Sequence, residues 1–358
     1  MEVIRFGSVK FKRTGAPWFS AATKLPTEHA WRRCAIAFLT VFFGGLGAIY
    51  SFLLVVDPYD TGRLPTPLPT GVFSGQGLFE TGQRTGSASR GRDPRFNAAV
   101  FGNSRAQLLD PAKLSDATGL SFVQLSIPGS GPREQMTLMR YFLRHHPDAE
   151  AMVLGVDERW CDHDPSLPVE FPFPFWLYRG NLEYLAHLLS TRAFTEAQTR
   201  IKLAMGLVSP ADPRGYVDYQ TGHAWSFHPP DASDGGPAAA AIPANTFFPA
   251  LEQFGVLLAE LPLQTRLVVM LPPVYHTALP RPGTQDAADL PACKAELARR
   301  LGRRASAVLD YLVVGPISSE PKNFMDLVHY RLNIARLIES RVASVLVAGT
   351  RTRARIAE

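Results

Sequence analysis

Cysteine is scarce in this sequence: there are three in 358 residues, and none belongs to a Cys-x-x-Cys pair or a cluster with histidine. Nothing therefore suggests a structural zinc site, which needs four such ligands at short spacings. Cys34 lies in an apolar stretch, so Cys161 and Cys293 remain in the rest of the chain. An oxidising compartment would permit one disulfide between these two, and the sequence leaves open whether it forms.

Excess basic charge is missing from most of the chain. The first 33 residues contain seven Lys and Arg but only two Glu, while the other 325 residues contain 30 basic and 30 acidic side chains. A protein that binds nucleic acid usually carries a basic patch on its folded domain. The neutral main part therefore argues against a nucleic-acid partner.

One apolar run is long enough to cross a bilayer. Residues 34–56 are 23 positions without a charged side chain, which suffices for a transmembrane helix. Arg32 and Arg33 precede this run, and the basic segment 1–33 predicts a cytoplasmic amino end and an exported carboxyl part. The run exceeds the apolar region of a signal peptide and no clear cleavage site follows it, so we interpret it as a signal anchor. In a bacterium this predicts a single-pass inner-membrane protein with a periplasmic main domain.

Three segments lie outside the regular pattern of helices and strands. Residues 57–96 are rich in Pro, Gly, Thr and Ser, which predicts an extended linker. We interpret residues 161–249 as an insertion that forms a lid or a partner surface. It begins with the aromatic run 171–176, which fits core packing, membrane contact or a sugar-binding surface. Residues 348–358 form a basic tail.

Residues 97–347 alternate between strands and helices. The pattern predicts strands at 97–101, 121–127, 151–156, 266–271 and 307–314, and helices at 105–118, 133–145 and 287–303, with a last helix that ends near residue 347. This alternation indicates an α/β fold with right-handed crossovers. We expect a flavodoxin-like three-layer sandwich around a parallel sheet of about five strands.

Ser104 follows the first predicted strand, where the buried run ends in Gly102-Asn103-Ser104. A serine at this corner lies at the carboxyl edge of the sheet, beside the free N–H groups of a helix N-terminus. Those N–H groups can stabilise negative charge, so Ser104 is a candidate nucleophile. The alternative is that Ser104 is only the N-cap of the next helix.

A nucleophilic serine needs a base and a group that orients the base. His329 is the one histidine with an aspartate three residues before it, Asp326, in a short loop after the last strand. Parallel strands end on one side of a sheet, so we expect His329 and Ser104 to meet at that edge. The alternative is that both residues only begin the final helix.

These residues resemble the motifs of the SGNH, or GDSL-like, hydrolase superfamily. The similarity comprises Gly102-Asn103-Ser104, a glycine turn at Gly129 or Gly131, and Asp326-x-x-His329, and it covers about residues 95–340. The membrane-anchored members look most similar: the periplasmic proteins of alginate-type polysaccharide O-acetylation and the DltD-like proteins of cell-wall D-alanylation. The resemblance implies that Ser104 is acylated, that His329 is general base and then acid, and that Asp326 orients it.

The resemblance also implies an oxyanion hole made by the Ser104 N–H and a glycine N–H at Gly129 or Gly131. Two positions depart from the family pattern. Asn103 stands where the family has Asp, and Asp157 follows the third strand where the family has an oxyanion-hole Asn. Asn103 or Arg105 could substitute for the missing donor. The expected activity is therefore that of an O-acyltransferase or esterase, with a catalytically inactive binding or assembly factor as the alternative.

Other polar residues are weaker candidates. Arg105, Asp157, Tyr275 and His276 all follow strands and are candidates for substrate binding. The acidic residues 157–164 are interpreted as a solvated loop, so no metal is expected, and Gly129-Ser130-Gly131 lacks the pattern of a nucleotide site. No cofactor is expected. The expected partners are an extracytoplasmic polysaccharide or envelope polymer, the membrane, and a multi-spanning membrane acyltransferase.

Overall fold

A computed structural model of the chain describes residues 28–71, 81–221, 226–229 and 242–357. The chain divides into two compact units, residues 1–49 and 50–358. In the first unit, residues 28–49 belong to helix α1 (Glu28–Val56). The whole of α1 has 29 residues and is long and apolar enough to cross a membrane. Its length is about 43 Å at the usual helical rise.

The second unit is built on a sheet of five strands, all parallel. They are β1 (Ala98–Phe101), β2 (Phe122–Gln124), β3 (Ala151–Gly155), β4 (Arg266–Leu271) and β5 (Ala305–Asp310). Their order is β2-β1-β3-β4-β5, with Ala99 of β1 opposite Val123 of β2 and Met152 of β3. This order is that of a flavodoxin-like sheet, so the predicted α/β fold with five parallel strands is confirmed.

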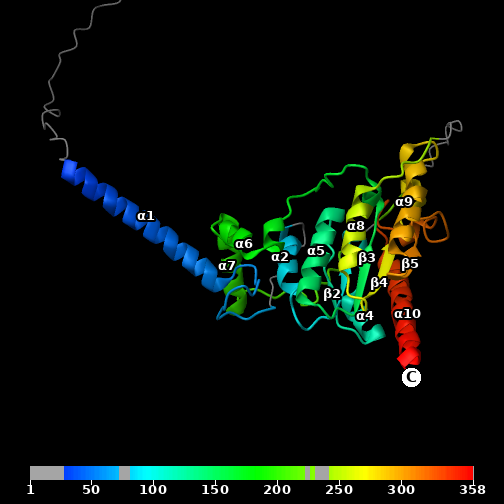
Figure 1. Cartoon of the computed structure of the whole chain (residues 1–358), viewed down its shortest axis with the longest axis horizontal. Helices are drawn as coiled ribbons and strands as arrows, with labels where there is room; N and C mark the ends of the chain where they lie inside the picture. Colours follow the sequence, from blue (N-terminus) through cyan, green and yellow to red (C-terminus); the bar gives the residue numbers. More distant parts are fainter. Residues whose placement is uncertain (1–27, 72–80, 222–225, 230–241, 358) are drawn as a thin grey trace, which may run out of the picture. The chain divides into compact units, whose positions relative to one another are not determined.

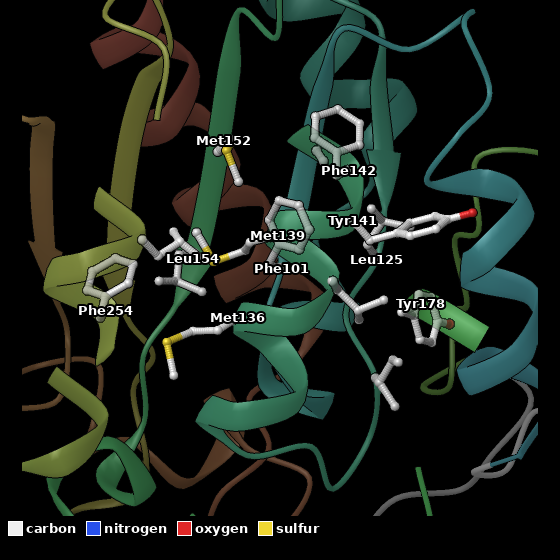
Figure 2. Close-up of a cluster of buried hydrophobic side chains, with 14 of the residues drawn as sticks. Phe101, Leu125, Met136, Met139, Tyr141, Phe142, Met152, Leu154, Tyr178 and Phe254 are labelled. Carbon is white, nitrogen blue, oxygen red and sulfur yellow. The ribbon is translucent and has the colours of Figure 1, made fainter. Parts of the chain in front are cut away.

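Helices cover both faces of the sheet (Figure 1). On one face α5 (Pro132–His145), α8 (Pro249–Glu260) and α9 (Gln285–Leu301) share a buried core with alternate strand residues such as Phe101 and Leu154. Figure 2 shows Met139 and Phe142 among those side chains. On the other face α4 (Pro111–Thr118) and α10 (Leu332–Ala357) cover the strand residues between them, such as Val100 and Val153. The strands are therefore buried on both faces, as parallel strands usually are.

The sequence predicts one helix at 105–118, but two are present: α3 (Ser104–Gln107) and α4. Asp110 breaks the helix because its backbone is extended and its carboxylate accepts the N–H groups of Ala112 and Lys113. Pro111 then starts α4, since proline suits the first helical position. At the far end of the chain, α10 continues to Ala357 and includes most of the expected basic tail.

The described part of residues 57–96 differs from the extended linker that its composition predicts. It includes α2 (Thr81–Arg90), and it packs onto the domain through buried charges. The Asp60 carboxylate accepts hydrogen bonds from Arg92 at 2.7 Å and from Arg200 at 2.9 Å. A buried carboxylate needs such partners, because an unpaired charge would be costly to remove from water.

The named elements within the described part of the insertion at 161–249 are helices. After β3 come a short turn of helix, η1 (Glu158–Cys161), then η2 (Phe175–Tyr178), α6 (Asn181–Leu188) and α7 (Thr191–Ala204). A disulfide joins Cys161 to Cys293 of α9 across 132 residues, which decides the pairing that the sequence left open. The aromatic run is partly buried, with the Phe173 and Tyr178 rings stacked and their centroids 5.2 Å apart. The remaining short turns are η3 (His276–Ala278) and η4 (Pro321–Asn323).

Candidate active site

Ser104 is the first residue of α3, directly beyond the carboxyl end of β1. The N-cap of this helix is Asn103 rather than Ser104, because the Asn103 side-chain oxygen accepts the Arg105 N–H at 3.0 Å. Gly102 makes the sharp turn, with a φ of +147°, and a Cβ there would lie 2.8 Å from the Cβ of Ala106. The Ser104 hydroxyl is thus left without a capping role.

The structure brings Ser104, His329 and Asp326 together, although 225 residues separate the first two. The Ser104 Oγ lies 2.8 Å from His329 Nε2, and His329 Nδ1 lies 2.7 Å from an Asp326 carboxylate oxygen. With the Nδ1 proton donated to the carboxylate, Nε2 is free to accept the hydroxyl proton of Ser104. This is the arrangement of a nucleophile, a base and an orienting acid.

Backbone groups fix the Asp326 carboxylate in place. Its other oxygen accepts the N–H groups of Val328 and His329, each at 2.8 Å. Burial acts to raise the pKa of Asp326, but the hydrogen bond and charge of His329 and these two N–H groups hold that pKa below its usual value. Asp326 therefore stays ionised at neutral pH and can stabilise an imidazolium.

The backbone N–H groups of Ser104 and Gly129 are among those that have no hydrogen-bond acceptor in the described part of the chain. Gly129 belongs to the turn after β2 and has a φ of +65°. The Gly131 N–H, in contrast, donates to the buried Glu134 carboxylate at 2.6 Å, as part of the start of α5. Of the two glycines that the family resemblance suggests, Gly129 is the one whose N–H is available to a ligand.

Asp157 follows β3 and is fully buried beside Asn103, as its 2 % exposure indicates. Its carboxylate accepts a hydrogen bond from the Asn103 side-chain amide and another from the Arg159 backbone N–H. Burial raises the pKa of Asp157, and the neighbouring Glu158 charge raises it further. Because both oxygens have donors, the carboxylate belongs to the support of the site and is not a free charge.

Arg105 is buried, and its guanidinium forms a two-pronged ion pair with Glu158, with both N···O distances 2.6 Å. It therefore joins α3 to η1, and its charge is already compensated. Such bidentate pairs have a defined geometry and hold their elements in register. Arg105 also lines the cavity next to the site, so its stem remains within reach of a ligand.

The other two candidates for substrate binding lie after β4. The Tyr275 ring is buried and packs edge-on against Phe227 and Phe324. The His276 N–H donates to the Ser318 carbonyl at 2.9 Å, and this residue starts η3. No hydrogen bond links either side chain to Ser104 or His329 among the described residues.

Tyr219, in the insertion, contacts the site and was not expected from the sequence. Its hydroxyl donates to the Ser104 carbonyl at 3.0 Å, and its ring stands edge-on to the His329 ring, with centroids 6.0 Å apart. The chain before it runs along the free edge of β2, where the Gln124 N–H donates to the Arg214 carbonyl. No motif marks this tyrosine in the sequence, because its role depends on where the insertion folds.

A cavity of about 430 Å³ lies next to the site. Arg105 and Val328 line it, and they adjoin Ser104 and His329 in the chain. One part of its wall is apolar, with Val274, Leu279, Leu290 and Leu312, and another part is charged, with Glu158, Arg159, Asp162, His163, Asp286 and Asp289. Within the described residues, no three His, Cys, Asp or Glu side chains are placed to hold a metal ion.

No protein-family model matches the chain, and no curated protein matches it either. We therefore infer function from the geometry of the site and from the family resemblance of its motifs.

Proposed function

We propose that this chain is an SGNH-like serine acyltransferase or esterase that acts on O-acyl groups of an extracytoplasmic polysaccharide or envelope polymer. The observation that carries the proposal is the chain of short hydrogen bonds from Ser104 through His329 to Asp326, at 2.8 and 2.7 Å. These three side chains come from opposite ends of the domain, and a nucleophile, base and orienting acid at these distances suit acyl transfer.

In the first half-reaction, His329 Nε2 takes the Ser104 proton as Oγ attacks the acyl carbonyl. The resulting tetrahedral intermediate collapses when the imidazolium returns this proton to the departing oxygen. The donor alcohol leaves, and an acyl group remains on Ser104. In the second half-reaction, a hydroxyl of the acceptor polymer, or water, gives its proton to His329 and attacks the acyl carbonyl. The imidazolium then protonates Ser104 Oγ, so the enzyme returns to its initial state.

The free N–H groups of Ser104 and Gly129 supply the oxyanion hole in this mechanism. Ser104 N–H is at the N-terminus of a helix, which favours negative charge, although α3 is short. The Asn103 side-chain amide is a third candidate donor, because one of its two hydrogens is bound by Asp157 and the other is left over. Each such donor is worth about 3 kcal/mol of barrier reduction in acyl-transfer enzymes.

Membrane anchorage belongs to the same proposal. Helix α1 spans the inner membrane once, with residues 1–33 in the cytoplasm and the catalytic domain in the periplasm. This topology follows from the basic residues before the apolar run. It places Ser104 where a multi-spanning acyltransferase could deliver acyl groups and where exported polymer passes. The anchor and the large insertion favour transfer over simple hydrolysis.

Labelling with a fluorophosphonate probe tests the nucleophile. The full chain in detergent should become covalently labelled, and Ser104→Ala should not. Ser344→Ala is the matched control, because its hydroxyl bonds only to a carbonyl on the exposed face of α10. Labelling of Ser104→Ala at the wild-type rate, or no labelling of a well-folded wild type, would refute the proposal. The second result would favour the inactive binding factor.

A second measurement separates transfer from hydrolysis. The chain is incubated with p-nitrophenyl acetate, with and without a soluble glycan, and acetylated glycan is detected by mass spectrometry. Transfer predicts acetyl ester on the glycan that is lost in Ser104→Ala. Release of p-nitrophenol without any glycan ester would instead assign the chain as an esterase.

A further inference from the structure

Helices α6 and α7, together with the short turns that follow them, expose several large apolar side chains. We call them the α6–α7 patch: Leu182, Leu189, Phe194, Met205 and Leu207. They lie within 26 residues of sequence. Exposed apolar residues scattered singly are ordinary, but a group of this size on one pair of helices usually marks a surface that contacts something else.

Packing within the domain does not use this patch, because α6 and α7 have other residues on their inner faces. Tyr184 and Leu188 of α6 are buried, as are Ala193, Ala197 and Arg200 of α7. Leu182 is in the first turn of α6, Leu189 directly follows the last residue of α6, and Phe194 is in the first turn of α7. The exposed apolar side chains are therefore distinct from those that pack into the domain.

Helices α6 and α7 contact the last turns of α1. The Tyr50 hydroxyl donates to the Leu185 carbonyl at 3.1 Å, and the Phe52 and Phe194 rings lie 6.1 Å apart. Leu53 is fully buried there. Just after α1, the Asp57 carboxylate accepts a hydrogen bond from the Tyr184 hydroxyl at 2.8 Å. Phe194 of the patch therefore lies beside the end of the apolar helix.

We propose that the α6–α7 patch is immersed in the boundary between the lipid headgroups and acyl chains of the bilayer that α1 crosses. This inference rests on the proposed anchorage of α1. Phe194 of the patch contacts Phe52, an exposed apolar residue on the last turns of α1, so the same lipid reaches both. Exposed Lys202 on α7 suits the phosphates of the headgroup layer, while Arg179 and Arg192 also pair with Glu183 and Glu196.

This contact gives the domain a second attachment to the membrane. A single helix on a loose tether would let the domain turn freely, whereas a patch beside the helix end restricts how the domain meets the bilayer. The insertion would then act as a membrane-facing platform.

Fluorescence quenching by spin-labelled lipid tests the inference in the full chain. Single cysteines are placed in a Cys34→Ser background, labelled with the environment-sensitive fluorophore NBD, and studied in nanodiscs of phosphatidylethanolamine and phosphatidylglycerol. The test site is Leu182→Cys and the matched control is Leu263→Cys, because both leucines are 83 % exposed. Phe42→Cys, in the middle of α1, reports on the anchor itself. The disulfide-bonded Cys161 and Cys293 remain unlabelled.

We expect lipid with a nitroxide near the headgroup to quench NBD at residue 182 several-fold more than at residue 263, with blue-shifted emission at 182. Lipid with a nitroxide deep in its acyl chain should quench NBD at residue 42 more than at residues 182 and 263. Equal, weak quenching at residues 182 and 263 would overturn the inference and would indicate that the patch faces solvent or a protein. Strong quenching at residue 42 in the same experiment would leave the proposed anchorage of α1 intact. Absence of quenching at 42 would refute the anchorage and with it this inference.

Discussion

The side-chain amide of Asn103 donates a hydrogen bond to the buried carboxylate of Asp157, 54 residues away. The bond joins the residue that precedes Ser104 to the residue that follows β3. In the family that the motifs resemble, these positions carry Asp and Asn, so the two side-chain types are exchanged here while the pair retains a donor and an acceptor. Asp157 thus positions Asn103, and through it the turn that presents Ser104.

Substitution of Asp157 tests this positioning role. Asp157→Asn removes the charge and keeps one oxygen, which can still accept the Asn103 amide at the expense of the Arg159 N–H, so we expect the labelling rate of Ser104 to stay within about twofold of wild type. Asp157→Ala removes the acceptor, and we expect a loss of about tenfold, which corresponds to about 1.4 kcal/mol in the barrier. The rate of fluorophosphonate labelling of each variant, followed by stopping the reaction at a series of times, measures both effects. If the two variants behave alike, Asp157 has no positioning role through this bond.

The Asp326–His329 pair predicts a specific defect for Asp326→Asn. The amide of Asn would donate to Nδ1, so the imidazole would carry its proton on Nε2 and could not accept that of Ser104. We expect acylation to slow by about 10³- to 10⁴-fold, with folding unchanged. His329→Ala should lose at least as much, whereas His187→Ala, at an exposed position on α6, should match wild type. A mild effect of Asp326→Asn would mean that this aspartate does not orient the base.

Glu134 predicts a pH dependence of stability. Burial raises its pKa to about 7, although the Gly131 N–H and the Arg84 charge oppose the shift. When the pKa of a carboxyl is higher in the folded than in the unfolded state, the protonated group stabilises the fold. This contribution is fully present below the unfolded pKa and is lost as the pH rises through the folded pKa, here about 7. Glu134→Gln keeps an acceptor for Gly131 without a charge. We therefore expect the variant to unfold at a higher temperature than wild type at pH values above 7, with the difference shrinking under acid conditions.

Thermal unfolding followed by tryptophan fluorescence across pH checks this expectation. The matched control is Glu260→Gln, which removes a half-exposed carboxylate whose partner is Arg140 on the surface. A pH-independent effect of Glu134→Gln would contradict the proposed titration.

The Cys161–Cys293 disulfide closes a long loop between η1 and α9. Such a bond restricts the unfolded chain, and its loss typically costs about 2–5 kcal/mol. We expect Cys161→Ser with Cys293→Ser to lower the denaturant midpoint. The fluorophosphonate reaction should also slow, because η1 carries Glu158, the partner of Arg105 in α3. Unchanged stability of the double variant, measured by denaturant titration, would show that the bond does not form in the native protein.

Much of the fold follows from local sequence. Strand-length apolar runs separated by helical segments predict five parallel strands, and the structure has five. The positions of Ser104 and His329 at one edge also follow, because every strand of a parallel sheet ends on the same side. The break at Asp110 is local too, although the sequence pattern predicts one continuous helix across this cap and the proline after it.

The sequence by itself determined the apolar helix, the alternating α/β pattern and the residue types at the strand ends, since these depend on neighbours a few positions apart. Tertiary structure alone decided the rest. It brought Tyr219 to the Ser104 carbonyl, paired Asn103 with Asp157, and buried Asp60 against Arg200 in a segment whose composition resembles a linker. Each of these contacts joins residues far apart in the chain, and their energy depends on burial, which the spacing of residues in a sequence does not encode.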